Sequence, residues 1–277
     1  MKRLIGIAGL FLLSCGTAAP PVMDGPERFK ITGSTTMNRL VQQWAFAYMD
    51  AHPGVFIETE SGSSRFGIES LISGKTDIGA ASRTMLADEV KRLLEKRGSL
   101  GMSILTARDA LSIYVHRENT VRDLSIDQVR AIFSGKIDNW RQVNGPQAPI
   151  LVVNRPPNSG TRVYFDQFVL QELDFTPEAR IVPTSRAVVE TVARWPNAIG
   201  YGGIRSGDGT VPCSINGVFP TAATVRDGTY PLNRYLYFYI AHSPRGAIKS
   251  FVDWILSDEG QAVVERAGYV PLWEPGS

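Results

Sequence analysis

The chain has 277 residues, of which 43% are hydrophobic and 20% are charged, and its formal net charge is +2. A chain of this length can bury a substantial core, either as one large domain or as two smaller ones. The near-neutral charge and the lack of any run of Lys or Arg give no indication of a nucleic-acid partner.

The first residues have the pattern of an export signal. Lys2-Arg3 is a short basic segment, and residues 4–13 form an apolar run that is too short to span a bilayer comfortably. The run ends in Leu12-Leu13-Ser14-Cys15-Gly16, which resembles the lipobox of bacterial lipoproteins, where the peptide is cut before the cysteine and the cysteine is lipidated. We therefore expect a signal peptide over 1–14, a lipid on Cys15 and a flexible leash over 15–26. An ordinary secretory signal with an incidental cysteine is the alternative.

The next part of the chain repeats one order of elements: a short strand, a loop rich in hydroxyl groups, and a helix. Apolar residues at helical spacing predict the helices, and β-branched runs predict the strands. The expected strands cover 29–32, 55–59 and 76–81, and the expected helices cover 37–49, 66–73 and 88–96.

A second unit begins with the strand expected at 110–115. Ser125-Ile126-Asp127-Gln128 predicts the cap of a helix over 129–133, which Gly135 ends. The apolar run at 235–240 predicts a strand inside a sheet. The remaining expected elements are strands at 149–153 and 199–203, helices at 163–170, 186–195, 246–256 and 257–267, and a turn-rich segment at 212–229.

Strands that alternate with helices favour an α/β architecture with mostly parallel sheets, in which ligands bind at the carboxyl ends of the strands. Three hydroxyl-rich turns stand at such places, each before an expected helix: Ser34-Thr35-Thr36, Ser63-Ser64 and Ser159-Gly160-Thr161. Ser82-Arg83 is a fourth candidate. Each turn alone is a good helix cap, but several together suggest convergence on one small anion.

The chemistry of these turns suits a tetrahedral oxyanion. Helix beginnings carry unpaired N–H groups and a partial positive charge, and hydroxyl side chains add further donors. Arg155, and Arg83 as a second candidate, would supply formal charge.

Other kinds of site find less support in the sequence. It contains no G-x-x-x-x-G-K-[ST] loop for a nucleotide triphosphate and no G-x-S-x-G elbow for a hydrolase. The three histidines, His52, His116 and His242, are scattered without ligand spacing, so we expect neither a metal site nor a cofactor. Only Cys213 would remain beside the lipidated cysteine, so we expect no intrachain disulfide. Binding without catalysis is therefore favoured.

At these residues the sequence resembles the phosphate-binding proteins of bacterial ABC transporters for inorganic phosphate. The resemblance runs from Ile31-Thr32-Gly33-Ser34-Thr35 to Gly268-Tyr269-Val270-Pro271-Leu272. Its most specific parts are residues 74–83, residues 132–140 and Arg155 through Arg162.

The resemblance implies a two-lobed periplasmic-binding fold of type II, in which each lobe is a mostly parallel sheet flanked by helices. Lobe 1 would comprise 27–110 and 229–277, lobe 2 would comprise 111–228, and the anion would lie in the cleft between them. The lobes would close about linkers near Ala110 and Thr229.

The resemblance also implies the ligands of the anion. Some family members place an aspartate where Ser82 stands, which accepts a hydrogen bond from protonated phosphate and repels sulfate. The chain here has Ser82-Arg83, as in another branch, so an oxyanion site is implied without a fixed choice between the two anions. The implied residues are Ser34, Thr35, Thr36, Ser64, Ser82, Arg83, Arg155, Ser159, Gly160 and Thr161.

We thus expect a monomeric lipoprotein in the periplasm or at the cell surface, anchored to a bacterial membrane. It would bind phosphate, or arsenate or another tetrahedral oxyanion, and deliver it to the permease of an ABC transporter. The alternatives are an exported enzyme that processes phosphate esters and a sensory or adhesive lipoprotein of the same fold.

Overall fold

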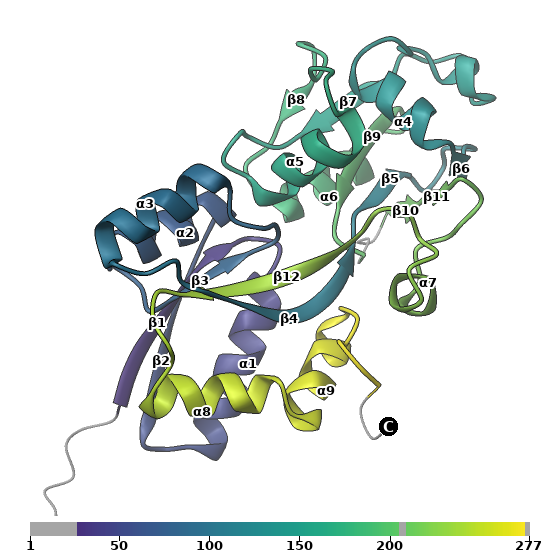
Figure 1. Cartoon of the computed structure of the whole chain (residues 1–277). Coiled ribbons are helices and arrows are strands. Elements are labelled where there is room, and N and C mark those ends of the chain that lie inside the picture. Colours follow the sequence, from purple (N-terminus) through teal and green to yellow (C-terminus); the bar gives the residue numbers. More distant parts are fainter. Residues whose placement is uncertain (1–26, 205–208, 275–277) are drawn as a thin grey trace, which may run out of the picture.

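The chain is built around two separate five-stranded sheets with helices packed on both faces of each (Figure 1). A computed structural model describes residues 27–204 and 209–274. The predicted signal peptide, Cys15 and leash lie outside the described residues. The α-helices are α1 Asn38–Ala51, α2 Ser64–Ile72, α3 Ala87–Arg97, α4 Ile126–Phe133, α5 Gly160–Phe165, α6 Ser185–Arg194, α7 Ala222–Arg226, α8 Gly246–Ile255 and α9 Asp258–Ala267.

The first sheet takes its strands from the first and the last part of the described chain, in the strand order β2-β1-β3-β12-β4. Strands β2, β1 and β3 are parallel, whereas β12 runs antiparallel to both β3 and β4. Because β4 runs in the direction of β1–β3 and leads out to the second sheet, the carboxyl ends of β1–β3 also point toward that sheet. The strands are β1 Glu27–Ser34, β2 Val55–Gly62, β3 Ile78–Ala81, β4 Met102–Ala110 and β12 Asn233–Ile240.

The second sheet has the strand order β10-β5-β9-β7-β8. Strand β5 follows β4 and runs away from the first sheet. Strand β9 is antiparallel to β5, and β7 is parallel to β9. The carboxyl ends of β7 and β9 therefore point toward the first sheet. The strands are β5 Ser112–His116, β7 Leu151–Asn154, β8 Arg180–Ile181, β9 Ala198–Gly202 and β10 Thr210–Pro212, beside a small parallel pair of β6 Asp123–Leu124 and β11 Ser214–Ile215.

The predicted α/β class and two-sheet arrangement are confirmed, but the sheets are mixed rather than mostly parallel. In each sheet two of the neighbouring strand pairs are antiparallel. In the first sheet the reason is the crossing of the chain, because β12 returns from the second sheet and runs opposite to β4, which led out to it. The sequence analysis also missed β4. The chain passes between the sheets at Leu111, so the expected boundary at 110/111 lies between β4 and β5, although the division into lobes stays a prediction.

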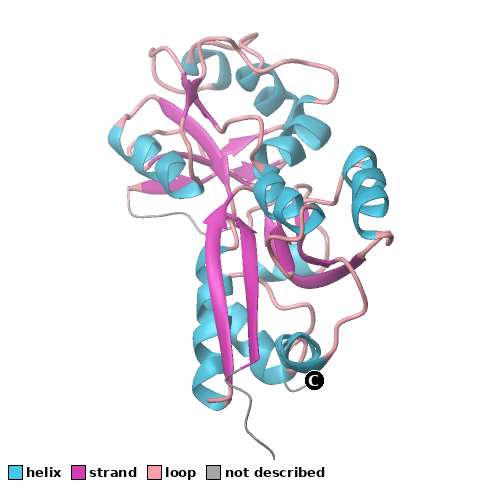
Figure 2. Cartoon of the chain, turned by 90° about the vertical axis from the view of Figure 1, so that its left-hand side faces the viewer, coloured by secondary structure: helices cyan, strands magenta, loops and turns pink. Residues whose placement is uncertain are grey.

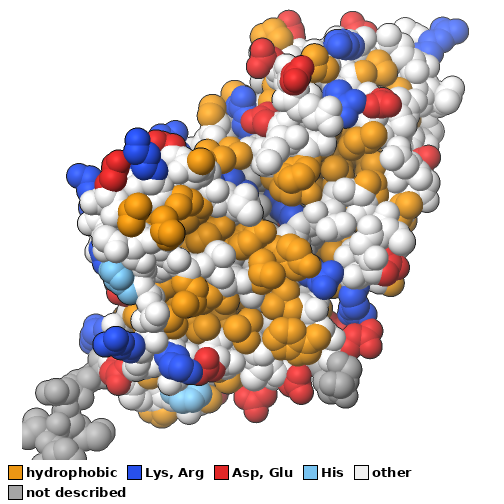
Figure 3. Space-filling view, in the orientation of Figure 1, with side chains coloured by type: hydrophobic (Ala, Val, Ile, Leu, Met, Phe, Trp, Pro, Cys, Tyr) orange, Lys and Arg blue, Asp and Glu red, His pale blue; other side chains and the backbone are white. Residues whose placement is uncertain are grey.

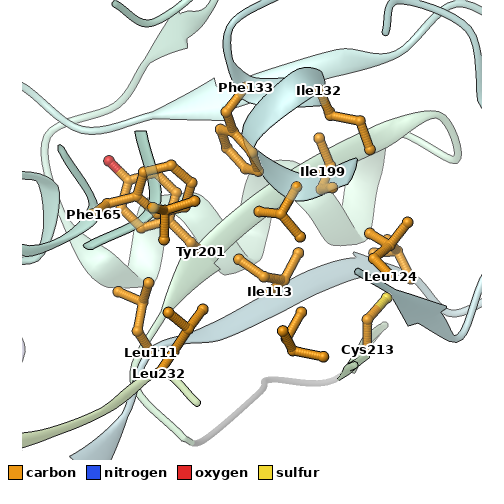
Figure 4. Packing of buried hydrophobic residues seen from close by; sticks show 14 of the residues in the cluster. Leu111, Ile113, Leu124, Ile132, Phe133, Phe165, Ile199, Tyr201, Cys213 and Leu232 are labelled. Carbon is orange, nitrogen blue, oxygen red and sulfur yellow. The ribbon is translucent and has the colours of Figure 1, made fainter. Parts of the chain in front are cut away.

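Alternating side chains of the strands enter different cores, as expected when both faces of a sheet are covered. In the first sheet Ala80 faces α1, α8 and α9, whereas Ala81 faces α2 and α3. Figure 2 shows helices on both sides of these strands. In the second sheet Ile113 and Ile199 belong to the large cluster in Figure 4, where Phe133 and Phe165 of α4 and α5 pack on Tyr201.

The predicted cap and the predicted end of α4 are confirmed. Ser125 caps α4 in a capping box with Gln128, and Gly135 follows the helix with a positive φ of 80°. The expected helix at 163–170 is a short α-helix, α5, that continues as a π-helical turn over Asp166–Leu170. Cys213 is a buried free thiol. None of the helices in the described ranges has the length and the apolar composition that crossing a bilayer requires.

The core of the first sheet gives a stability prediction. Trp44 is fully buried, and its indole N–H donates a 2.8 Å hydrogen bond to the carbonyl of Gly260. Trp44→Phe removes this hydrogen bond and part of the buried ring volume, which we expect to lower the free energy of unfolding by about 1–3 kcal/mol. Urea denaturation measures the loss, and Trp195→Phe, at a half-exposed tryptophan, is the control with little change. Equal stability of both variants would contradict the expectation.

Candidate functional site

Three hydroxyl-rich segments lie together at the carboxyl ends of β1, β2 and β3. Ser34 ends β1, and Thr35 and Thr36 lead into α1. Ser63 caps α2 by accepting a 3.0 Å hydrogen bond from the amide of Phe66, which leaves the neighbouring Ser64 in the first turn. Because parallel strands end at one edge of a sheet, loops from distant parts of the sequence meet there. This edge faces the second sheet.

The second sheet presents the loop that follows β7. Asn154 holds its start: the Oδ1 atom accepts hydrogen bonds from the backbone N–H of Arg155 at 2.7 Å and from the Tyr201 hydroxyl at 2.5 Å. Ser159 is the N-cap of α5, and its backbone N–H donates to the carbonyl of Pro156 at 3.0 Å. Gly160 and Thr161 begin the helix, where the first backbone N–H groups have no intrahelical acceptor.

The two sets of loops touch each other. The hydroxyls of Thr36 and Thr161 lie 2.9 Å apart, and the Arg155 guanidinium donates to the Thr35 hydroxyl at 3.2 Å. Gly160 lies directly against Ser64 and Ser82: a Cβ atom on Gly160 would stand 2.0 Å from the Ser64 Oγ atom and 2.8 Å from that of Ser82. The convergence expected from the sequence is therefore present at the junction of the two sheets.

Arg155 is the charged group of this junction. Its side chain is 2% exposed and donates to the Ser185 hydroxyl at 2.9 Å and to the Pro183 carbonyl at 3.0 Å. Within the described ranges its Nε–H finds no hydrogen-bond acceptor, and no carboxylate forms an ion pair with it. Burial, together with the positive charge of Arg234, lowers the pKa of Arg155 to about 10. The guanidinium is thus an uncompensated buried cation, which an anion would stabilise.

The Ser64 and Ser82 hydroxyls form a second part of the site. Both residues are buried; the Ser82 backbone N–H donates to the Ser64 Oγ atom at 3.1 Å, and the two Oγ atoms are 3.3 Å apart. Neither residue bears a charge.

Figure 3 shows Lys and Arg side chains in the hollow between the upper and lower parts of this face of the molecule.

Arg83 requires a correction. The sequence suggested that its guanidinium supplies charge to the anion, but both of its NH groups donate to the Glu89 carboxylate at 2.7 Å. This pair is buried, and Glu89 also accepts from the backbone N–H of Leu86 at the start of α3. The charge of Arg83 is therefore neutralised locally, and its side chain stabilises the beginning of a helix.

The sequence analysis missed Ser185, Asp109 and Arg234. Ser185 begins α6, and its hydroxyl lies 3.3 Å from that of Thr36 as well as beside Arg155. It follows the same strand–hydroxyl–helix order as the other loops, but its strand β8 has two residues and gives no sequence signal. Asp109 and Arg234 form a buried ion pair next to Thr161. In the described ranges no three His, Cys, Asp or Glu side chains gather in a way that could hold a metal ion.

Comparisons with known proteins identify the family of the chain. The model of the PBP superfamily domain matches residues 20–259. The phosphate-binding protein PstS of Pseudomonas aeruginosa is 32% identical, covering 98% of this chain and 95% of its own, and that of Bacillus subtilis is 31% identical over 87% and 80%. The chain belongs to the family of PstS-like phosphate-binding proteins.

A solved structure extends the agreement to the fold. The phosphate ABC transporter substrate-binding protein of Clostridium perfringens, solved with bound phosphate, superposes with a TM-score of 0.82 at 30% identity. The superposition covers 89% of this chain and 100% of that one. Members of this family are extracytoplasmic binding proteins and not enzymes, so the alternative of an enzyme for phosphate esters is set aside.

The contact at Gly160 gives a prediction. In Gly160→Ala the new methyl group would overlap the Ser64 hydroxyl, so the loop at Gly160 could no longer approach Ser64 as closely as it does here. We expect anion affinity to fall at least about tenfold, or about 1.4 kcal/mol, with unchanged thermal stability of the unligated protein. Titration calorimetry with phosphate measures the first and thermal unfolding the second. Gly54→Ala, where an added Cβ meets nothing within 4 Å, is the matched control, and equal affinities would refute the close approach.

Proposed function

We propose that this chain binds inorganic phosphate at the junction of its two sheets and delivers it to the permease of an ABC transporter. The observation that carries the proposal is Arg155, a buried cation without a carboxylate partner among the described residues, surrounded by hydroxyl groups from both sheets. A buried charge of this kind is costly unless an opposite charge joins it. A tetrahedral oxyanion supplies that charge and accepts hydrogen bonds on every oxygen.

The proposed ligands come from both sides of the junction. The backbone N–H groups at the beginnings of α1 and α2 favour negative charge, and α6 begins at the same place. Arg83 is left out, because Glu89 neutralises it. The residues proposed to bind phosphate are Ser34, Thr35, Thr36, Ser64, Ser82, Arg155, Ser159, Gly160 and Thr161, with Ser185 added from the structure.

Capture would require both lobes. Micromolar binding corresponds to about 8 kcal/mol, and the donors on one sheet leave several phosphate oxygens without partners. We propose that lobe 2 turns against lobe 1 about the linkers near Ala110 and Thr229, so that Arg155, Gly160 and Thr161 meet Thr36 and Ser64 only when the protein is closed. Opening at the permease would release the anion.

Ser82 bears on the choice of anion. A hydroxyl can accept a hydrogen bond from a protonated phosphate oxygen, but it does not repel a fully ionised anion as a carboxylate would. Phosphate and arsenate should therefore bind alike, and sulfate should compete measurably. Competition titrations with the three anions measure this order.

The function predicts a specific behaviour of Arg155→Met. Removing an uncompensated buried charge should leave the unligated protein at least as stable as the parent, whereas tight phosphate binding should be lost. At phosphate equal to 100 times the dissociation constant, the parent gains about 2.7 kcal/mol of stability and the variant should gain almost none.

Calorimetry and thermal unfolding, each with and without phosphate, measure both effects. Arg186→Met is the matched control, because Arg186 neighbours the site in sequence but its side chain is 88% exposed. Phosphate binding by Arg155→Met at the parent's affinity would overturn the proposed function.

We also propose that a lipid on Cys15 anchors the protein to the membrane surface. The proposal rests on the sequence of the export signal, and 26 residues of the chain precede β1. Cys15→Ser should transfer the exported protein from the detergent phase to the aqueous phase in a phase-separation assay. Retention of the variant in the detergent phase would exclude this anchor.

A further inference from the structure

The two strands that connect the sheets carry a buried ion pair. Asp109 of β4 and Arg234 of β12 stand opposite each other in the antiparallel register. The Nε and Nη2 atoms of Arg234 donate to one carboxylate oxygen, Oδ2, at 3.0 and 2.8 Å. Asp109 is 0% exposed and Arg234 4% exposed. The Tyr164 ring lies 5.7 Å from the guanidinium carbon and covers it from the second sheet. The pair is therefore fixed in position and electrically neutral.

Each member of the pair also contacts a segment of the second sheet. The other carboxylate oxygen of Asp109 accepts a 2.9 Å hydrogen bond from the backbone N–H of Ile204, which follows β9. The Nη1 atom of Arg234 donates to the Thr161 hydroxyl at 3.2 Å. The ion pair thus reaches from the connecting strands into the loop that holds Gly160 and Thr161. The bond between Arg234 and Thr161 is lost if that loop moves away from β12.

The direction of the hydrogen bond decides what Thr161 can do. A guanidinium can only donate, so the Thr161 oxygen must be the acceptor. The single hydrogen of that hydroxyl is then free to point to the Thr36 oxygen, 2.9 Å away, or to a bound anion. Without Arg234 the hydroxyl could rotate and turn a lone pair toward the anion, which would repel it. Arg155 fixes the hydroxyls of Thr35 and Ser185 in the same sense.

We propose that Arg234, held by Asp109, is a positioning residue that makes the Thr161 hydroxyl a donor to the bound anion when the two sheets meet. This inference rests on the proposed function. Arg234 differs in role from Arg155. The charge of Arg234 is already neutralised by Asp109, and Arg234 acts through Thr161, whereas Arg155 pairs with the charge of the anion.

A double-mutant cycle tests the proposal. The variant Asp109→Asn/Arg234→Met removes both charges together, so that no buried charge is left without a partner. We expect it to weaken phosphate binding about tenfold. In a Thr161→Val background the same change should have almost no effect, because the hydroxyl through which Arg234 acts is absent. Arg234 forms no hydrogen bond with Ser64, so in a Ser64→Ala background the full tenfold loss should remain.

Calorimetric titration with inorganic phosphate up to millimolar concentration measures all of these affinities, and circular dichroism checks that each variant is folded. Additive losses in the Thr161→Val background, or unchanged affinity of the neutral pair, would overturn the proposal. A parent protein that does not bind phosphate at all would instead overturn the proposed function, so the two failures are distinguishable.

Arg234→Lys keeps the test decisive if the neutral pair does not fold. Lysine preserves the charge opposite Asp109 but lacks the planar fork that serves both the carboxylate and Thr161. We expect a folded protein with a similar tenfold loss of affinity, which again disappears in the Thr161→Val background. Parent-like affinity of Arg234→Lys would refute the positioning role.

Discussion

The buried guanidinium of Arg155 is the constraint around which the junction of the two sheets is arranged. Taking a charge out of water costs several kcal/mol unless a partner compensates for it, and within the described ranges only neutral oxygens surround this one. A binding protein gains from this arrangement, because a carboxylate in the same place would compete with the ligand. The free energy that pairing Arg155 would contribute is therefore released when the anion binds, and it adds to the affinity for the anion.

The other arginines near the junction show how the chain confines that positive charge to one point. Arg83 is neutralised by Glu89, and Arg234 by Asp109, in both cases through two short hydrogen bonds within the buried interior. Arg162, whose guanidinium donates to the Arg155 carbonyl, lies 3.6 Å from the Asp166 carboxylate, so among these four arginines of the described chain Arg155 is the one without a carboxylate partner. Around it stand hydroxyls, which adjust their hydrogens at little cost, and helix beginnings, whose N–H groups point to the same place.

Local chemistry explains which parts could be predicted from the sequence. The capping box at Ser125, the loop at Arg155 and the turns after β1 and β2 depend on neighbouring residues, and they were recognised. Strand β4 was missed because Ser, Thr, Arg and Asp interrupt its apolar residues, and its pairing partner lies more than 120 residues away. For the same reason the ion pair of Asp109 and Arg234 left no sequence signal. Arg83 was predicted to supply charge to the anion, but its guanidinium donates to both carboxylate oxygens of Glu89, six residues further along the chain.

The order of strands in the first sheet has a consequence for how the protein is made. Strand β12 lies between β3 and β4, although more than 120 residues of chain separate it from β4. During synthesis β3 and β4 must wait, with their facing edges unpaired, until the whole second sheet has emerged. The second sheet, by contrast, draws all its strands from one continuous stretch and can form early. Folding should therefore proceed from the middle of the chain outward. A polypeptide that ends before Asn233 would expose the unpaired edges of β3 and β4, which could pair with strands of other chains.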